Sequence, residues 1–336
     1  MSTSGRITRR RAIQIVASAG GLALSARMRI AAAAPRSLVH TWRGIALGAR
    51  ASITVCHHDA AQARRLLRLC VDEIRRLEDV FSLYRRDSAI ARLNRYGFLD
   101  QPPADLVRLL ATAHAFGDLT RGAFDPTVQP LWTLYAAHFA RSAARPEGPD
   151  ESAIDKAIGL VDYRKVSVAT HRIAFERRGM AITLNGVAQG YITDRVAECL
   201  RNEGLDDVLV DLGEIRGLGR NSDGRPWTVG LEDPRVPGRV VETMTLENRA
   251  LASSAGFATR FDERGRHHHL FDPRSGASAS RYLGITVIAP TATTADALST
   301  GFAGIELGDV KKLLQQFPSV TARLTTSTGE VVSLSG

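Results

Sequence analysis

The sequence predicts an α+β fold, in which helices and strands follow one another without regular alternation. A chain of 336 residues, 44% of them hydrophobic and 24% charged, is long enough to bury a large core and has the composition of a globular protein. Apolar residues recur with a period of two in some segments and with helical spacing in others. Because the two kinds of segment do not alternate regularly, a doubly wound parallel sheet is not expected.

The first part of the chain is predicted to be mainly helical. The expected elements are a strand at residues 50–56, a long helix capped by Asp59, a short helix capped by Asp87 and ending near Asn94, a helix from Pro102–Pro103 to about Gly122, and a helical run from the turn at residues 122–127 through Leu134. The long helix is the best supported, because apolar residues from Ala63 to Leu77 fall on one of its faces.

The second part is predicted to contain most of the strands. After a loop at residues 145–149, the expected elements are a strand and hairpin region at 166–184, a helix from Tyr191 that stops before Gly204, strands at 208–212, 227–231, 240–246 and 285–288, a helix at 294–302, a helix capped by Asp309, and a hairpin that turns near Gly329.

The stretch TLNGVAQGYITDRV, residues 183–196, is the one around which we expect the chain to be organised. Small residues at Gly186, Ala188 and Gly190 lie between the end of a strand and the start of a helix. Such a turn lets a ligand approach the backbone, and the N–H groups at a helix start attract anions. The alternative is a tight turn that binds nothing. The stretch is not a Walker loop and lacks the full dinucleotide-binding pattern.

The N-terminus is predicted to be an export signal. Residues 1–33 contain six arginines and no acid, which leaves +3 of the formal net charge of +9 for residues 34–336 and argues against a nucleic-acid surface. Arg9 and Arg10 precede a short, weakly apolar segment, and Ala33 ends a small-residue cleavage pattern. We therefore expect a twin-arginine-type signal peptide at 1–33, rather than a disordered basic tail, and a periplasmic mature protein at 34–336 without a membrane span.

The three cysteines do not predict a disulfide framework. Cys56, Cys70 and Cys199 are odd in number and widely spaced, so we expect them to be buried small residues rather than disulfide partners or metal ligands.

Two clusters near the C-terminus carry side chains suited to chemistry. Asp296 and Thr300 are four residues apart, so on a helix they lie one above the other and offer hard oxygen donors suited to Mg²⁺; the alternative is that Asp296 only caps the helix. His267, His268 and His269 precede a DPRSG turn. One of these histidines could act on a phosphate or hydroxyl group, or the segment could be an exposed strand end.

Taken together, the motifs resemble those of the ApbE family of FAD:protein FMN transferases. Seven segments follow the family's order from about Gly48 to Phe302: FSLYRRDSAIARLN, GAFDPTVQPLW, LNGVAQGYITD, VDLGEIRGLG, ASSAGF, HLFDPRSG and TATTADALST. The resemblance implies a mixed α/β fold of two lobes with FAD in the cleft between them. It also implies an Mg²⁺-dependent reaction that transfers FMN to a threonine of an acceptor flavoprotein and releases AMP.

The resemblance also implies roles for single residues. Carried over by motif, the metal ligands are Asp296, Thr300 and the backbone carbonyl of Ala188, and the catalytic residues are Asp296 and His269. The residues expected around the flavin or the phosphates are Leu47, Tyr84, Asp125, Gln189, Tyr191, Ser254 and His269.

The chain departs from the family pattern at three places. Gln189 replaces the usual lysine of the central motif, Leu47-Gly48-Ala49 replaces Met-Gly-Thr, and Gly213-Glu214 replaces a Gly-Gly pair. The NGVAQGY form is similar to the NosX branch, whose members serve the flavoprotein NosR. Two alternative functions stay open: an FAD pyrophosphatase that yields FMN and AMP, and a flavin carrier or maturation factor without turnover.

Overall fold

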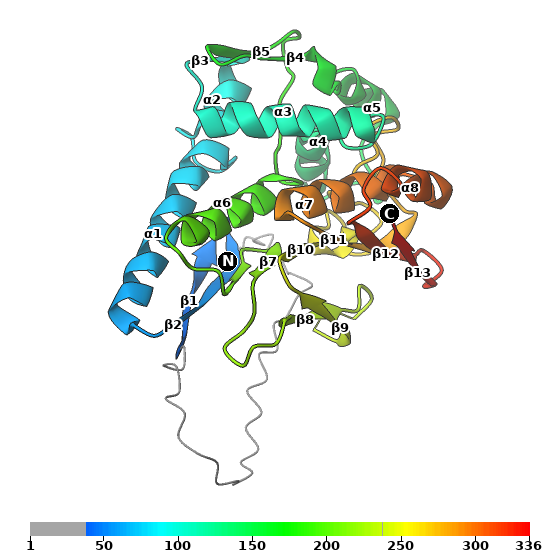
Figure 1. Cartoon of the computed structure of the whole chain (residues 1–336). Helices are drawn as coiled ribbons and strands as arrows, with labels where there is room; N and C mark the ends of the chain where they lie inside the picture. The colour runs from blue at the N-terminus through cyan, green and yellow to red at the C-terminus, as the bar shows by residue number, and fades with distance from the viewer. Residues whose placement is uncertain (1–37, 237) are drawn as a thin grey trace, which may run out of the picture.

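The computed structural model describes residues 38–236 and 238–336, and its largest element is an antiparallel sheet of eight strands (Figure 1). The strands lie in the order β1 (Leu38–Ala46), β2 (Ala49–His57), β6 (Val208–Asp211), β7 (Ile215–Leu218), β10 (Arg249–Ser254), β11 (Tyr282–Ala289), β12 (Thr321–Thr326) and β13 (Val331–Ser335). Their order in the sheet therefore follows their order in the chain.

One face of this sheet packs against the helices α1 (Ala60–Phe81), α6 (Ala188–Asn202) and α7 (Ala292–Gly301) (Figure 1). Val210 and Val287 are fully buried under this helical layer. The opposite face is partly covered by a two-stranded hairpin, β8 (Trp227–Glu232) and β9 (Val240–Leu246), which packs on Leu209 and Leu251. Neighbouring residues of β6 thus face opposite layers, as the period of two in a strand requires.

A second helical layer lies beyond α6 and α7 (Figure 1). Its elements are α2 (Ala89–Tyr96), α3 (Ala104–Leu119), α4 (Gln129–Phe139), α5 (Glu151–Ile158) and the small antiparallel sheet of β3 (Phe98–Asp100), β5 (Arg172–Phe175) and β4 (Val166–Val168). One buried cluster runs from the large sheet through α6 and α7 into α3, where Leu106, Leu109 and Leu110 are fully buried. The helix α8 (Leu307–Leu314) precedes the last hairpin.

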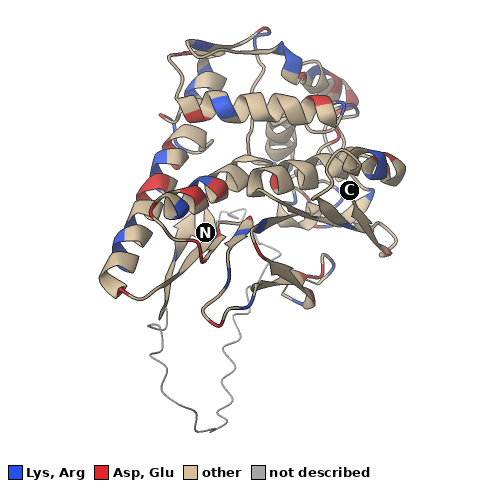
Figure 2. Cartoon of the chain, in the orientation of Figure 1, with Lys and Arg blue, Asp and Glu red and all other residues tan. Residues whose placement is uncertain are grey.

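The predicted α+β fold is confirmed, and several local predictions hold. Asp59 caps α1, because its carboxylate accepts hydrogen bonds from the N–H groups of Ala61 and Gln62. The last hairpin turns at Gly329, which has a positive φ of 92°. Basic and acidic side chains are interspersed along α1, as expected for a solvated helix face (Figure 2). No described helix has the length and apolar character that crossing a membrane requires.

Two predicted helix caps are wrong. The cap of α2 is Ser88 rather than Asp87: the Ser88 hydroxyl accepts from Ala91 N–H and donates to the Ser82 carbonyl, so it joins the helix start to the end of α1. The residue that caps α8 is Glu306 rather than Asp309, because the helix begins three residues earlier than expected, at Leu307. Asp309 lies in the first turn, where a carboxylate is also favourable.

The segment before α6 is not a strand, contrary to prediction. Ile182 and Leu184 are buried, but no strand pairs with them. Instead the side-chain amide of Asn94 bonds both the N–H and the carbonyl of Ile182 at 2.8 Å, and Thr183 N–H donates to the Pro126 carbonyl. Asn94 is therefore not the end of α2, which continues to Tyr96.

Other differences concern element boundaries. The helix α6 begins at Ala188, three residues before the expected start, because Tyr191 N–H already bonds the Val187 carbonyl. The strands β1, β3, β7 and β10 and the helix α5 are absent from the elements expected from the sequence. Cys56 and Cys70 are buried as expected, whereas Cys199 is only half-buried, and all three thiols are free. The predicted signal peptide lies outside the described residues.

Candidate active site

The candidate site forms where α6 and α7 meet at their first turns. Asp296 is 4% exposed and projects from α7 toward α6, where its Oδ2 accepts a hydrogen bond of 3.0 Å from Gly190 N–H. Only glycine fits at position 190, because a Cβ atom there would lie 2.3 Å from the Ala292 carbonyl oxygen. The small residues of the central stretch thus allow two backbones to approach, and they bring a carboxylate to a helix N-terminus.

Hydroxyl groups surround the next turn of α7. Thr300 follows Asp296 by one turn, and its side chain lies against Gly186. A Cβ added at Gly186 would lie 2.8 Å from Thr300 Cγ2. Ser254, at the end of β10, has its Oγ 2.8 Å from Ser299 Oγ and 3.4 Å from Thr300 Oγ1. The structure therefore brings together the turn before α6, Asp296, Thr300 and Ser254.

Ser299 is a member of this group that the sequence analysis does not identify. It is 1% exposed, and its hydroxyl bonds the Asp296 carbonyl as well as Ser254. Its spacing of three residues from Asp296 was the available signal, because side chains three apart on a helix share a face.

The environment of Asp296 disfavours an uncompensated negative charge. Burial raises the pKa of this carboxyl group, as does the nearby charge of Asp194, while the hydrogen bond from Gly190 N–H lowers it. Among the described residues, that N–H is the only donor to the Asp296 side chain. A buried carboxylate of this kind is stabilised by a cation, and the oxygen atoms around it are of the type that hard cations prefer.

Gln189 lies beside another departure from the family pattern, Gly213-Glu214. Its side-chain amide donates to the Leu212 carbonyl at 3.2 Å, immediately before Gly213-Glu214. Thr193, one turn further along α6, donates to the carbonyls of Gln189 and Glu214. The two sequence changes are therefore neighbours in space, at the contact between the first turn of α6 and the β6–β7 turn.

The side chain of Tyr191 points toward α3. Its hydroxyl donates to Asp105 at 2.6 Å and lies 3.3 Å from Arg108, and its ring packs edge-on against Phe81. Burial and the neighbouring Asp105 raise the pKa of Tyr191 to about 12. This side chain anchors the start of α6 to the second helical layer.

Asp125 closes the turn that leads into α4. Its carboxylate accepts hydrogen bonds from the N–H and hydroxyl of Thr127 and from Tyr163 N–H. Burial is the largest influence on the Asp125 carboxyl and raises its pKa. These contacts hold the turn against the short 3₁₀ helix at Tyr163–Lys165.

Leu47 and Tyr84 are each placed near the end of α1. Leu47 adopts a positive φ of 52°, and its N–H donates to Glu78 at 2.6 Å. Tyr84 follows the last turn of α1 and is 72% exposed, and its N–H bonds Ser82. These two predicted site residues thus lie next to the long helix, not on α6, α7 or β10.

His269 is half-buried and lies against the segment that follows β10. Its Nδ1 is 3.2 Å from the Thr259 carbonyl, which also accepts its backbone N–H. A bond from Nδ1–H to this carbonyl leaves Nε2 as the nitrogen that accepts a proton. The neighbouring His268 is the buried one, with 8% exposure, and its ring packs on Gly256.

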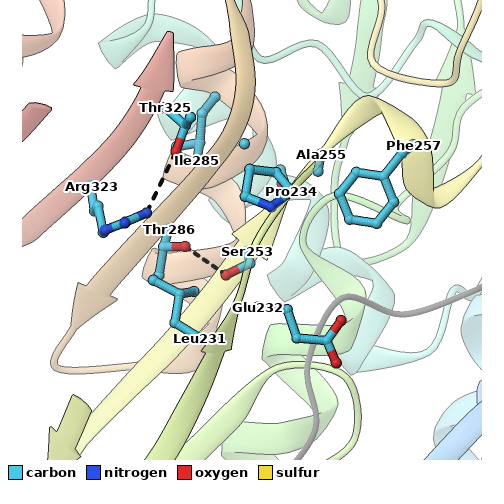
Figure 3. Close-up of a pocket in the computed structure, with 12 residues that line it drawn as sticks. Leu231, Glu232, Pro234, Ser253, Ala255, Phe257, Ile285, Thr286, Arg323 and Thr325 are labelled. Atoms are coloured by element: carbon cyan, nitrogen blue, oxygen red, sulfur yellow. Dashed lines mark hydrogen bonds between the residues drawn. The ribbon is translucent and has the colours of Figure 1, made fainter. Parts of the chain in front are cut away.

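A pocket of about 310 Å³, including space open to solvent, lies beside Ser254 on the hairpin side of the sheet (Figure 3). Ser253 and Thr286 line it and share a hydrogen bond of 2.9 Å. The lining residues come from β8, β10, β11 and β12 and from the segments that follow β8 and β10. The pocket therefore shares Ser254 with the candidate site but does not include Asp296 or Thr300.

Comparison with known proteins decides the family. The ApbE family matches residues 47–324, which include every residue of the candidate site. The chain belongs to the ApbE family. Curated relatives named FAD:protein FMN transferase include one from Haemophilus influenzae, 33% identical over 70% of this chain and 72% of the relative. Another, from Treponema pallidum, is 32% identical over 78% of this chain and 77% of the relative.

Solved structures agree with this ApbE assignment. The ApbE protein from Thermotoga maritima superimposes with a TM-score of 0.78 and 28% identity, over 88% of this chain and 97% of that chain. The predicted family and mixed fold are thus confirmed, and the relatives have the predicted enzyme class, a transferase.

Proposed function

We propose that this ApbE-family chain is an Mg²⁺-dependent FAD:protein FMN transferase. It attaches FMN through a phosphoester bond to a threonine of an acceptor flavoprotein and releases AMP. The observation that carries the proposal is the buried Asp296 carboxylate, held at the first turn of α6 and one turn before Thr300. The names of the curated relatives support the reaction.

The residues present fit a magnesium ion. Asp296, Thr300 and the backbone carbonyl of Ala188 are the oxygen ligands we assign to it. No three His, Cys, Asp or Glu side chains gather into a metal site within the described chain. This suits Mg²⁺, because that ion usually takes one or two carboxylates and completes its shell with water and substrate phosphates. Bound there, Mg²⁺ would neutralise negative charge on the pyrophosphate of FAD.

The remaining steps use side chains of the chain itself. The threonine oxygen of the acceptor forms a bond to the FMN phosphorus, the bond from that phosphorus to the bridging oxygen breaks, and AMP leaves with the electron pair. We assign the hydroxyl proton to His269 Nε2, since Nδ1 faces the Thr259 carbonyl. The N–H of Gly190 fixes the orientation of Asp296 throughout.

The flavin is assigned to the side where Leu47 and Tyr84 lie, between the two lobes expected of the family. Asp125, Tyr191 and Ser254 support the elements around it through the contacts described above. Residues 1–33 act in this proposal as a twin-arginine-type signal, which sends the folded enzyme to the periplasm. The acceptor is then an exported flavoprotein, and the NosX-like central motif favours a NosR-like one.

The test is to incubate residues 34–336 with FAD, Mg²⁺ and an acceptor domain, and to follow covalent flavin by in-gel fluorescence. We expect fluorescence on the acceptor and stoichiometric AMP. Asp296→Ala should lower the rate by orders of magnitude, because it removes the only charged metal ligand. Asp309→Ala, an exposed carboxylate on α8, is the matched control and should keep the wild-type rate.

The products discriminate between the proposal and its alternatives. Free FMN with AMP and no labelled acceptor would show a pyrophosphatase, and unchanged FAD would show a carrier. Full activity of Asp296→Ala, or activity undiminished in EDTA, would refute the metal assignment.

A further inference from the structure

The two helices that form the candidate site cap each other at their N-termini. Gly190 N–H of α6 donates to Asp296 of α7, and Ala292 N–H of α7 donates to Asp194 of α6 at 2.8 Å. In each helix the donor and the carboxylate are four residues apart, which places them on the same face. Each helix thus supplies the carboxylate that satisfies an unpaired N–H group at the start of the other.

Asp194 makes the more extensive of these two contacts. Besides Ala292 N–H, it accepts from the N–H of Thr293 at 2.9 Å and from the Thr293 hydroxyl at 2.6 Å. Both carboxylate oxygens are therefore engaged with the first turn of α7. Hydrogen bonds accepted by both oxygens fix the distance of this helix end and also its rotation about the helix axis, so they set the direction in which Asp296 projects.

Arg216 of β7 holds Asp194 in this position. The two side chains form an ion pair, and they are 9% and 8% exposed, respectively. A buried carboxylate close to Asp296 would otherwise repel it, since two like charges in a shared site disfavour each other. The guanidinium therefore lets a second acid lie beside the metal ligand, and it also ties α6 to the large sheet.

From this geometry we propose that Asp194, held by Arg216, is a positioning residue for the metal ligand Asp296. This inference rests on the proposed function, because it concerns the Mg²⁺ assigned to Asp296 and Thr300. Asp194 itself acts through α7: it fixes the first turn, and the first turn fixes the two ligands that follow it. Residues that hold metal ligands in position typically change metal affinity by about 10- to 100-fold when they are replaced.

The experiment compares metal binding with protein stability. In Asp194→Asn an amide N–H₂ must face one of the α7 N–H donors, and the ion pair with Arg216 is lost. We expect the Mg²⁺ concentration for half-maximal transfer to rise about 10-fold or more. Mn²⁺ binding in the presence of FAD, followed by electron paramagnetic resonance, should weaken by the same factor, while FAD affinity in EDTA stays unchanged.

Four further variants separate positioning from folding. Asp233→Asn removes another buried carboxylate that pairs with an arginine, in the β8–β9 hairpin, and should leave metal binding unchanged. Arg216→Lys keeps the positive charge and should retain metal affinity. Arg216→Met removes the charge and should bind the metal more weakly. Thr293→Val removes one hydrogen bond to Asp194 and should weaken Mn²⁺ binding to a smaller extent, so it decides the question if Asp194→Asn does not fold.

The results that would overturn the inference differ from those that would overturn the proposed function. Unchanged Mn²⁺ affinity in folded Asp194→Asn, or in Thr293→Val when the former is unfolded, refutes the positioning role. A parallel loss of FAD affinity in EDTA refutes it as well, because it would show general damage to the site. Absence of transfer by the wild type, with Mn²⁺ still bound, refutes the proposed function and leaves the positioning role supported if the variants bind Mn²⁺ more weakly.

Discussion

Replacing Gly190 by alanine should destabilise the protein and impair the candidate site together. The added Cβ would lie 2.3 Å from the Ala292 oxygen and 2.8 Å from Thr293 N, both of them backbone atoms that no rotamer change can move. Relief to an ordinary contact requires α6 and α7 to separate by about 1 Å. The same movement stretches the bond from Gly190 N–H to Asp296, now 3.0 Å, beyond hydrogen-bonding distance.

The magnitude follows from three contributions. Overpacking costs about 1–3 kcal/mol, and loss of a hydrogen bond to a charged group costs about 1.5–3 kcal/mol. The better helix propensity of alanine returns about 1 kcal/mol. The free energy of unfolding should therefore fall by roughly 1.5–5 kcal/mol. At an unfolding entropy of about 2.1 cal/mol/K per residue, this corresponds to a Tm lower by roughly 2–8 °C for a chain of this size.

The assay is thermal unfolding followed by circular dichroism, together with the FMN transfer rate at a temperature where the variant is folded. The matched control is Gly308→Ala in α8, where a Cβ meets no atom within 4 Å and the free energy of unfolding should rise by up to about 1 kcal/mol. A Gly190→Ala protein with wild-type Tm and transfer rate would refute the reasoning, since it would show that the two helices separate without consequence.

Three other predictions concern single groups. Gln189→Lys should tighten FAD binding or raise the transfer rate, because a charge-assisted hydrogen bond to a phosphate is about twice as strong as a neutral one. Gln189→Met is the control that has neither the charge nor the amide. Weaker FAD binding and slower transfer by Gln189→Lys would mean that the site depends on the amide bonded to Leu212. Burial acts to raise the pKa of Asp105, but hydrogen bonds from two neighbouring side chains outweigh it and lower that pKa. The stability that Asp105 provides is therefore present at neutral pH and lost in acid, so urea unfolding should find the destabilisation by Asp105→Asn largest near pH 7 and shrinking below about pH 4; a constant difference would contradict this. Replacing Arg9 and Arg10 by lysine should retain the precursor in the cytoplasm, and fractionation that finds normal export would exclude a twin-arginine route.

Local signals in the sequence predicted the parts of the fold that local interactions decide. Asp59 caps α1 because the cap and the N–H groups it satisfies are within three residues of each other. The failure at Ile182 has the opposite cause. Its backbone is satisfied by the side chain of Asn94, 88 residues earlier, and no periodicity within 180–184 distinguishes that partner from a neighbouring strand.

The sequence indicates which residues belong to the candidate site better than it indicates how they are arranged in space. The spacing of Asp296 and Thr300 places both on one helix, and the motif order connects them with the turn before α6. The reciprocal capping through Asp194 depends on how two helices cross, and their sequences are about 100 residues apart. Similarly, only the packing of α6 against α3 determines that Tyr191 bonds Asp105.

The order of strands in the large sheet has a consequence for how the chain is assembled during synthesis. Each strand of this sheet lies beside the strand that precedes it in the chain, leaving aside strands that belong to other sheets. A newly made segment can therefore add to the exposed edge of the sheet already present, and no strand has to enter between two that are paired. One pair of neighbouring strands is separated by a long stretch of sequence. Strand β2 ends at His57, but its partner β6 begins only at Val208, so β2 cannot pair with it until that segment has been synthesised. Until then the ribosome-bound chain carries an open edge, which is the period when an unfinished sheet is most prone to pair with another chain.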